Sequence, residues 1–313
     1  MVTLAEMERI KTIKEIPNVD YFAAGHRMCA GCGIPILIRN LLRAIPGPKV
    51  IVTATGCLEV TTSIYPYTAW GVPWIHLAFE NTAAVAAGLE SAFKALERKY
   101  GKQKMTVIGI AGDGGTYDIG IQALSGALER GHDFIYVCYD NEAYMNTGIQ
   151  RSGGTPLGAS TTTSPAGKVI PGKPQFKKPL MDIVVAHNIP YAATLNPAYI
   201  VDMYNKLLKA GRIEGPKFLH YLCPCPTGWR APSNMSIKLA RLAVQTLIWP
   251  LYEVEHGKYR ITVNIRSPKP VEEYLKLQGR FRHLFKPENR WIIDELQKWV
   301  NRNWERLQKL TQL

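Results

Sequence analysis

The sequence contains no long apolar segment. No run of about 18 uncharged apolar residues occurs among its 313 residues, whereas a helix that spans a bilayer needs about 20. Residues 1–16 also lack the apolar core and small-residue cleavage site of a signal peptide. Internal repeats and low-complexity tracts are missing as well. We therefore expect a folded, soluble, cytoplasmic protein without a membrane partner.

Acidic residues are scarce relative to basic ones. The chain has 38 Lys and Arg against 25 Asp and Glu, and residues 230–313 alone hold 16 basic and 8 acidic residues. Such a surplus fits nucleic acid, an acidic protein partner or an ordinary solvated surface. The C-terminal segment has no recognisable nucleic-acid-binding module, and Trp291, Leu296, Trp299 and Trp304 recur at roughly helical spacing. We favour an amphipathic helix that packs on this chain or on a neighbouring subunit over a nucleic-acid-binding face.

Residues 49–226 alternate short β-rich runs with helical ones. This alternation is typical of a mostly parallel sheet covered by helices on both faces, and the nearly continuous apolar runs fit buried parallel strands. The predicted strands are Val50–Ala54, Trp74–Ala78, Met105–Ala111, Phe134–Tyr139, Tyr191–Thr194 and Phe218–Cys223. The predicted helices are Asn81–Tyr100, Tyr117–Arg130, Leu180–His187 and Ala198–Ala210. The expected fold class is therefore α/β, with a doubly wound, mostly parallel sheet.

Two segments depart from this rhythm. Asn146–Lys178 is rich in Gly, Pro, Ser and Thr and has no apolar period, and loops of this length inside a compact domain are usually functional or disordered. We favour a function, because the loop follows a candidate site. Later elements are predicted as a helix, a hairpin and further helices, at Asn234–Ile248, around His256-Gly257 and from Pro270 onward. We expect an α/β domain at 1–230 and a helical and hairpin extension at 231–313 that contacts partner subunits.

A glycine-rich turn, Gly112-Asp113-Gly114-Gly115, follows the third predicted strand. At such a strand end, glycines let the backbone approach a phosphate, and the next helix offers free N–H groups. Asp113 would hold a cation, and Mg²⁺ commonly bridges phosphate oxygens to hard oxygen ligands. Gly-Asp-Gly alone also fits an ordinary turn. Paired with Asn141 after the next strand, it resembles the thiamine diphosphate signature, on which Asp113, Asn141 and the Ala143 carbonyl bind Mg²⁺.

Four of the six cysteines are spaced as metal ligands. Cys29 and Cys32 form a Cys-x-x-Cys pair, and Cys57 and Cys225 stand on separate segments. In a reducing cytoplasm, clustered cysteines are more often metal ligands than disulfides. Four thiolates can hold zinc or a [4Fe–4S] cluster. The isolated third and fourth positions favour iron–sulfur, and zinc stays open as the alternative.

The other two cysteines have different surroundings. Cys223 lies two residues before Cys225 on the same strand face, so periodicity does not decide which of them is the fourth ligand. Cys138 lies in the middle of a predicted strand between Val137 and Tyr139. That position is typical of a small core residue.

With both motifs in place, the chain resembles the beta subunit of multi-subunit 2-oxoacid:ferredoxin oxidoreductases, of the pyruvate branch. The resemblance spans nearly the whole chain. Seven stretches carry it: 29–33 (CAGCG), 55–59 (TGCLE), 74–81 (WIHLAFEN), 112–115 (GDGG), 146–158 (NTGIQRSGGTPLG), 224–229 (PCPTGW) and 270–280 (PVEEYLKLQGR). It implies a sheet of the thiamine diphosphate-binding PP-domain type and the thiamine-dependent oxidative decarboxylation of a 2-oxoacid.

The resemblance also implies roles for individual residues. It assigns the role of [4Fe–4S] cluster ligand to four cysteines, Cys29, Cys32, Cys57 and Cys225. It places Cys57 and Gly112–Gly115 beside thiamine diphosphate, and it makes Asn146 a catalytic residue near the thiazolium and the substrate. Some long single-chain relatives carry an acidic cofactor contact where this sequence has Ile34, so we do not count that contact.

The resemblance implies a complex. In this family the carboxylate that activates the aminopyrimidine comes from another chain, so we expect Glu59, Glu80 and Glu142 to be structural. Relatives work with alpha, gamma and delta subunits, transfer electrons to ferredoxin and use CoA as acyl acceptor. Pyruvate is favoured because residues 55–59 resemble that branch, and branched 2-oxoacids and oxalate are the alternatives. From a different class, a zinc-stabilised, basic nucleic-acid-binding protein would leave the Asp113 and Asn141 pair unexplained.

Overall fold

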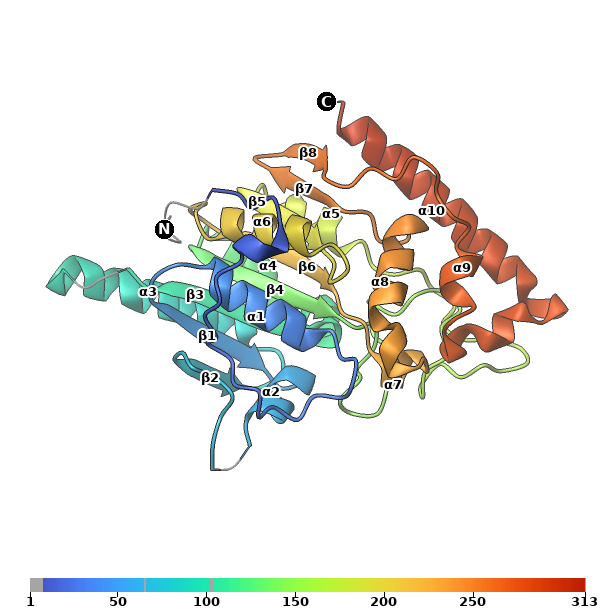
Figure 1. The fold of residues 1–313 in the computed structure, drawn as a ribbon, viewed down its shortest axis with the longest axis horizontal. Coiled ribbons are helices and arrows are strands. Elements are labelled where there is room, and N and C mark those ends of the chain that lie inside the picture. The colour runs from blue at the N-terminus through green and yellow to red at the C-terminus, as the bar shows by residue number, and fades with distance from the viewer. Residues whose placement is uncertain (1–7, 65, 102–103, 313) are drawn as a thin grey trace.

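The computed structural model describes residues 8–64, 66–101 and 104–312. These residues form one mixed sheet with the strand order β2-β1-β3-β4-β6-β5-β7-β8 (Figure 1). Residues 1–7, which belong to the charged opening segment of the chain, lie outside the described residues. The doubly wound α/β fold predicted from the sequence is confirmed.

All six strands predicted between residues 50 and 223 are present and run parallel. They are β1 Lys49–Ala54, β2 Trp74–Leu77, β3 Thr106–Gly112, β4 Phe134–Asp140, β5 Tyr191–Leu195 and β6 Lys217–Leu222. The expectation that each is buried on both faces is wrong for β2. This strand lies at the edge of the sheet and pairs only with β1, so Ile75 remains 39% exposed.

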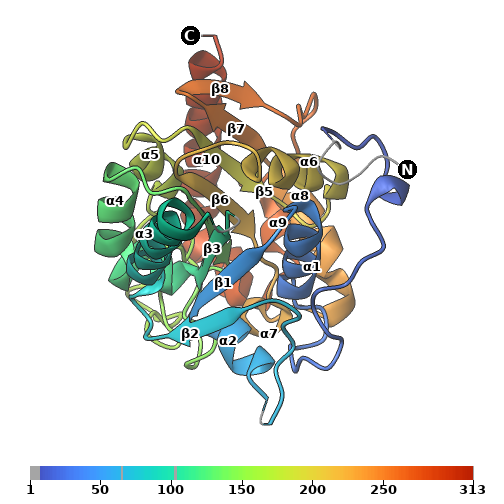
Figure 2. The ribbon, with the colours of Figure 1, turned by 90° about the vertical axis from the view of Figure 1, so that its left-hand side faces the viewer.

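Helices cover both faces of the sheet, with α1 and α6 on one side and α3 and α4 on the other (Figure 2). The helices before β6 are α1 Ile34–Ala44, α2 Cys57–Thr62, α3 Thr82–Tyr100, α4 Ile121–Glu129, α5 Leu180–Val185 and α6 Ile200–Ala210, with short 3-10 and π-helical turns η1 Ile13–Glu15 and η2 Gly114–Ile119. The sequence did not predict α1 or α2. It also missed that the helix predicted from Tyr117 is preceded by a π-helical turn, η2, which begins at Gly114.

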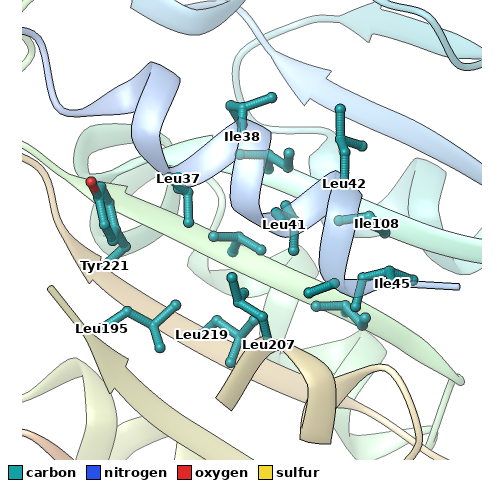
Figure 3. Close-up of a cluster of buried hydrophobic side chains, with 14 of the residues drawn as sticks. Leu37, Ile38, Leu41, Leu42, Ile45, Ile108, Leu195, Leu207, Leu219 and Tyr221 are labelled. Carbon is teal, nitrogen blue, oxygen red and sulfur yellow. The ribbon is translucent and has the colours of Figure 1, made fainter. Parts of the chain in front are cut away.

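Helix α1 contributes much of one buried apolar cluster. Its apolar side chains point at the sheet, where Leu37 and Leu41 lie in one buried cluster with Ile108 of β3, Leu219 of β6 and Leu207 of α6 (Figure 3). The side chains that alternate with these along the strands point to the other face of the sheet, where they belong to a second buried cluster. Burying a Leu or Ile side chain contributes about 1.5–3 kcal/mol, so these two clusters fix the strand ends that form the site.

Replacing Leu41 by alanine should lower the free energy of unfolding by about 2–5 kcal/mol, because the surrounding side chains cannot close the cavity completely. Leu41 is 0% exposed, whereas Leu96 on α3 is 41% exposed. Leu96→Ala is therefore the matched control, with an expected change within about 0.5 kcal/mol. Urea denaturation measures both. Equal losses in the two variants would contradict the assigned core.

The C-terminal segment both extends the sheet and covers its end. Its elements are α7 Pro226–Trp229, η3 Ser233–Met235, α8 Ser236–Gln245, β7 Tyr252–Glu255, β8 Lys258–Ile261, α9 Glu272–Leu275, η4 Gly279–Phe285, η5 Pro287–Asn289 and α10 Arg290–Leu310. The predicted hairpin is β7 and β8, and β7 pairs antiparallel with β5. The amphipathic helix predicted at the tail is α10, whose Ile292, Leu296 and Val300 are buried on this chain while Trp291 is 56% exposed.

No helix in the part of the chain that the structure describes is long and apolar enough to cross a membrane.

The sheet has a topological switch point between β1 and β3. The chain passes from β1 to β2 on one side and then returns to β3 on the other. In open parallel sheets, ligands bind outside the carboxyl ends of the strands at such a point.

Candidate functional site

A cavity of about 250 Å³ lies at the switch point. Segments at the carboxyl ends of β1, β3 and β4 line it, at residues 55–57, 112–115, 141 and 143–147, together with Phe79 and Tyr139. All eight residues predicted to bind the cofactor are among the lining residues: Cys57, Gly112, Asp113, Gly114, Gly115, Asn141, Ala143 and Asn146. Sites for small molecules usually measure about 300–1,000 Å³. The cavity is therefore slightly smaller than most such sites.

Asp113 is a buried carboxylate without an ion pair. It directly follows β3, is 1% exposed, and accepts a hydrogen bond from the Ser152 hydroxyl. Among the described residues, no lysine, arginine or histidine forms a salt bridge with it. Burial, and then the neighbouring Asp140 carboxylate, raises the pKa of Asp113 well above its usual value. A lone buried carboxylate is unfavourable unless it is protonated or bound to a cation.

Two further polar groups meet Asp113. The Asn141 side-chain amide lies 2.9 Å from Asp113 Oδ1 and 2.8 Å from the Ala143 carbonyl oxygen. With its nitrogen toward these atoms, the amide donates two hydrogen bonds; with its oxygen toward them, three oxygens converge on one point. Carboxylate, amide and carbonyl oxygens are the ligands that Mg²⁺ takes in proteins. The donor set and the uncompensated charge of Asp113 therefore fit a divalent cation.

The glycine-rich turn is packed too closely for larger residues. A Cβ atom on Gly114 would lie 2.3 Å from the Tyr144 ring. Gly154 of the long loop is packed closely against the site as well, because its Cβ atom would lie 3.0 Å from Asp140 Oδ1 and 3.1 Å from Asp113 Oδ2. Gly114 begins η2, which continues through Gly120 into α4. Backbone N–H groups at the start of a helical segment can therefore face a bound phosphate.

The segments that carry the predicted sulfur ligands lie next to this cavity. Gly33, directly after Cys32, donates its N–H to the Pro224 carbonyl over 3.0 Å, which joins the first cysteine loop to the segment before Cys225. Cys57 is the first residue of α2 and lines the cavity itself. Burial, followed by the neighbouring thiols of Cys225, Cys32 and Cys29, raises the pKa of Cys57 to about 12.

These thiols do not form a closed ligand set in the part of the chain that the structure describes. No group of three or more His, Cys, Asp or Glu side chains there meets as a metal site. Instead, the neighbouring thiol of Cys223, which is buried in the core, lowers the pKa of Cys32, while Cys225 accepts an N–H from Gly228 over 3.4 Å. The ligand roles of the four cysteines stay predictions.

Sequence reasoning missed a buried charge network behind the predicted cation site. Asp140, the last residue of β4, is 0% exposed, and its Oδ2 lies 2.6 Å from the Tyr117 hydroxyl, 2.8 Å from His220 Nε2 and 2.8 Å from Lys177 Nζ. Burial alone would raise the pKa of Asp140, but Lys177 and His220 lower it below its usual value. Burial lowers the pKa of His220, which favours its neutral form.

Glu142 connects this network to the C-terminal segment. Its Oε1 lies 3.1 Å from Lys177 Nζ, and its Oε2 accepts a hydrogen bond from Arg280. The expectation of a structural role for Glu142 agrees with these contacts. No local pattern in the sequence marks Lys177 or Arg280 as its partners, although Arg280 belongs to one of the stretches that carry the resemblance.

A cavity of similar volume, about 250 Å³, lies between α5, the residues around Trp249 and α10. It is lined mainly by apolar side chains and reaches Lys177 and His220 of the charge network. None of the predicted site residues lines it. The predicted cofactor-binding residues therefore line the switch-point cavity and not this one.

Comparison with known proteins assigns the family. Residues 54–221, more than half of the chain, match the family described as thiamine pyrophosphate enzyme, C-terminal TPP binding domain. The chain is 55% identical over 292 residues to pyruvate synthase subunit PorB of Methanocaldococcus jannaschii, which covers 92% of this chain and 97% of that protein. It is 50% identical over 309 residues to ketoisovalerate oxidoreductase subunit VorB of Pyrococcus furiosus, which covers 98% of each.

A solved structure shares the fold. The 2-oxoglutarate:ferredoxin oxidoreductase from Magnetococcus marinus aligns with a TM-score of 0.54 at 18% identity, over 74% of this chain and 84% of that one. At this identity the likeness concerns the fold alone. The sequence relatives go further, because their names describe subunits of oxidoreductases that act within complexes. The chain belongs to the thiamine pyrophosphate enzymes and, among these, to the family of 2-oxoacid:ferredoxin oxidoreductase beta subunits that includes PorB and VorB.

Proposed function

We propose that this chain holds thiamine diphosphate, Mg²⁺ and a [4Fe–4S] cluster in a complex that oxidatively decarboxylates a 2-oxoacid. The observation that carries the proposal is the switch-point cavity, in which the Asn141 amide lies between the Ala143 carbonyl and the Asp113 carboxylate, which has no ion pair among the described residues. Family membership supports thiamine diphosphate as the ligand. It also argues against the zinc-stabilised nucleic-acid-binding alternative, which offers no role for this carboxylate.

Each part of the cavity has a role in the proposal. Asp113, Asn141 and Ala143 hold Mg²⁺ against the diphosphate, while the backbone of Gly112–Gly115 approaches the phosphate oxygens. Thiamine diphosphate, when bound, supplies the electron sink that decarboxylation of a 2-oxoacid requires. Asn146 lines the same cavity and orients the substrate there by hydrogen bonding.

The chain needs a partner for catalysis. Glu142 cannot serve as the carboxylate that activates the aminopyrimidine, because Lys177 and Arg280 already hold both of its oxygens. Glu59 is held by His76 over 3.1 Å. We propose that an alpha subunit supplies this carboxylate and covers the open side of the cavity. The gamma and delta subunits complete the cytoplasmic complex, and residues 231–313 contribute contacts through exposed groups such as Trp291.

Electrons leave through the cysteine loops in this proposal. Cys29, Cys32, Cys57 and Cys225 bind the cluster. Cys57 belongs to both regions, because it lines the cofactor cavity and its thiol neighbours the other three. A cluster held there would supply one-electron transfer toward the delta subunit and ferredoxin, and CoA would take the acyl group.

Pyruvate is the favoured substrate. The relative named pyruvate synthase is 55% identical and the relative named ketoisovalerate oxidoreductase is 50% identical. Sequence identity therefore separates pyruvate from a branched 2-oxoacid only slightly. An anaerobic assay of the intact complex with pyruvate, branched 2-oxoacids, oxalate and 2-oxoglutarate, which follows ferredoxin reduction with and without CoA, tests the proposal. Pyruvate should give the highest kcat/KM. If none of these acids reduces ferredoxin, the proposed function is wrong.

The two neighbouring cysteines should differ in their effect on the cluster. Cys225→Ala should lower the iron content by about four atoms per complex, because the Cys225 thiol neighbours the Cys57 thiol. Cys223→Ala should retain them, because Cys223 is 1% exposed within the apolar core. Iron analysis and the visible spectrum of the two purified complexes measure the difference. Loss of iron only in the Cys223 variant would reverse the assignment.

A further inference from the structure

The predicted Mg²⁺ loop contains a conformation that needs external support. Glu142 lies between Asn141 and Ala143 and has a φ of 72°, in the left-handed region. Residues other than glycine adopt this region rarely, and glutamate is not among those enriched there. Such a conformation persists where surrounding contacts impose it, and these residues cluster at functional sites. The direction of the Ala143 carbonyl depends directly on this backbone turn.

Every polar group of Glu142 is engaged. Its N–H donates to Asp140 Oδ1 over 3.1 Å, and its carbonyl accepts from the Thr155 hydroxyl over 2.7 Å. Its carboxylate lies 3.1 Å from Lys177 Nζ and accepts a hydrogen bond from Arg280. The residue is 5% exposed, so water screens these contacts little. The neighbouring Asp140 and three segments that are more distant in sequence therefore fix one backbone position.

Arg280 is itself held rigidly. It is 2% exposed, its Nε and Nη2 donate to Gln278 Oε1 over 3.0 and 2.7 Å, and its guanidinium stacks 4.5 Å from the centre of the Trp229 ring. A buried, stacked arginine keeps the fixed geometry that its planar group offers. Arg280 can therefore hold the Glu142 carboxylate in one place.

Trp229 links the same unit to the neighbouring residue of the loop. Its Nε1 donates to the Asn141 carbonyl over 2.9 Å, and its side chain is 0% exposed. Trp229 ends α7, whose N-cap is Cys225. One buried unit thus holds the Asn141 backbone, the Glu142 side chain and the helix that follows Cys225.

On the basis of the proposed function, we infer that Glu142, Lys177 and Arg280 form an electrostatic clamp that positions Asn141 and Ala143 for Mg²⁺. The clamp makes the C-terminal segment part of the cofactor site, although none of its residues lines the cavity. Lys177, from the end of the long loop, balances Asp140 and one oxygen of Glu142, while Arg280 balances the other. Asp113 then remains the carboxylate available for the cation.

Arg280→Met in the intact complex tests this directly. Isothermal titration calorimetry of thiamine diphosphate at increasing Mg²⁺ should show the half-saturating Mg²⁺ concentration raised about 10–100-fold, the usual effect of removing a group that orients a metal ligand. Arg280→Lys should raise the half-saturating Mg²⁺ concentration less, because lysine keeps the positive charge but lacks the planar guanidinium with its fixed set of hydrogen-bond donors. Arg306→Met, which removes a partly exposed ion pair with Asp182, is the matched control and should leave Mg²⁺ dependence unchanged.

Second-site changes separate positioning from charge balance. Glycine adopts a positive φ without strain, so Glu142→Gly combined with Arg280→Met should restore most of the Mg²⁺ affinity. Glu142→Ala combined with Arg280→Met should restore little, although it removes the same unpaired carboxylate. A role limited to neutralising buried charge predicts equal recovery in both double variants.

Each outcome has a defined meaning. The clamp is wrong if Arg280→Met and Arg280→Lys both keep the wild-type Mg²⁺ dependence, or if the glycine and alanine double variants recover equally. Where Arg280→Met fails to assemble, Arg280→Lys and the two double variants carry the same comparison. Failure of the wild-type complex to bind thiamine diphosphate in an Mg²⁺-dependent manner would instead refute the proposed function on which the clamp rests.

Discussion

Asp113→Asn should abolish Mg²⁺-dependent binding of thiamine diphosphate and lower 2-oxoacid oxidation by more than about 100-fold. Loss of a residue that only orients a metal ligand costs about 10–100-fold, and Asp113 is proposed as a ligand itself. Asparagine keeps the shape of the side chain but removes the one buried carboxylate that lacks an ion pair among the described residues. Calorimetry of cofactor binding to the complex measures the effect, and the cluster spectrum should be unchanged.

The same variant gives an opposite result for stability without cofactors. Because a lone buried charge destabilises the folded protein, Asp113→Asn should unfold at the same or a higher temperature than wild type when Mg²⁺ and thiamine diphosphate are left out. Asp182→Asn is the control, since it removes a partly exposed carboxylate paired with Arg306 and should leave cofactor binding intact. Normal thiamine diphosphate binding by Asp113→Asn would show that the metal site is misassigned.

Cys57→Ser should remove the cluster nearest to thiamine diphosphate while cofactor binding remains. Four thiolates hold a [4Fe–4S] cluster, so loss of one ligand should lower the iron content by about four atoms per complex. The serine side chain leaves the Mg²⁺ ligands in place, because Asp113, Asn141 and Ala143 follow β3 and β4, whereas residue 57 follows β1. Iron analysis, visible absorption and calorimetry on the same preparation separate the two effects.

Cys138→Ala is the matched control for this experiment. Cys138 is a fully buried residue of β4 that packs with Val52, Ala111 and Tyr136 in the core behind the site. Its removal should lower stability slightly and leave the iron content unchanged. If Cys57→Ser kept its full iron content, or if Cys138→Ala lost the same amount, the assignment of Cys57 as a ligand would be wrong.

The sheet could be predicted from the sequence because its signal is local. Apolar runs such as those at Val107 and Phe134 lie between glycine-rich or polar turns, and a continuous apolar run predicts a buried parallel strand. The carboxyl ends of parallel strands meet at one edge of a sheet, so the sequence alone predicts that Asp113 and Asn141 lie close together. The structure confirms that they meet.

Other features depend on contacts that no local pattern carries. Glu142 and Arg280 are 138 positions apart, and Lys177 comes from a loop without an apolar period. The partner of a buried charge is set by the fold and not by neighbours in sequence. The same holds for Cys32, whose pKa is lowered by the neighbouring Cys223 thiol although the resemblance does not count Cys223 among the four ligands.

The most direct test of the account is the visible spectrum of the anaerobically purified complex, recorded before and after a stoichiometric addition of pyruvate. In the proposed function, the thiamine site and the cluster lie side by side at Cys57. The complex should therefore show the absorption of an oxidised [4Fe–4S] cluster, and pyruvate should bleach it only when thiamine diphosphate and Mg²⁺ are both present. A colourless preparation that contains zinc and no iron, or bleaching that does not depend on thiamine diphosphate, would contradict it.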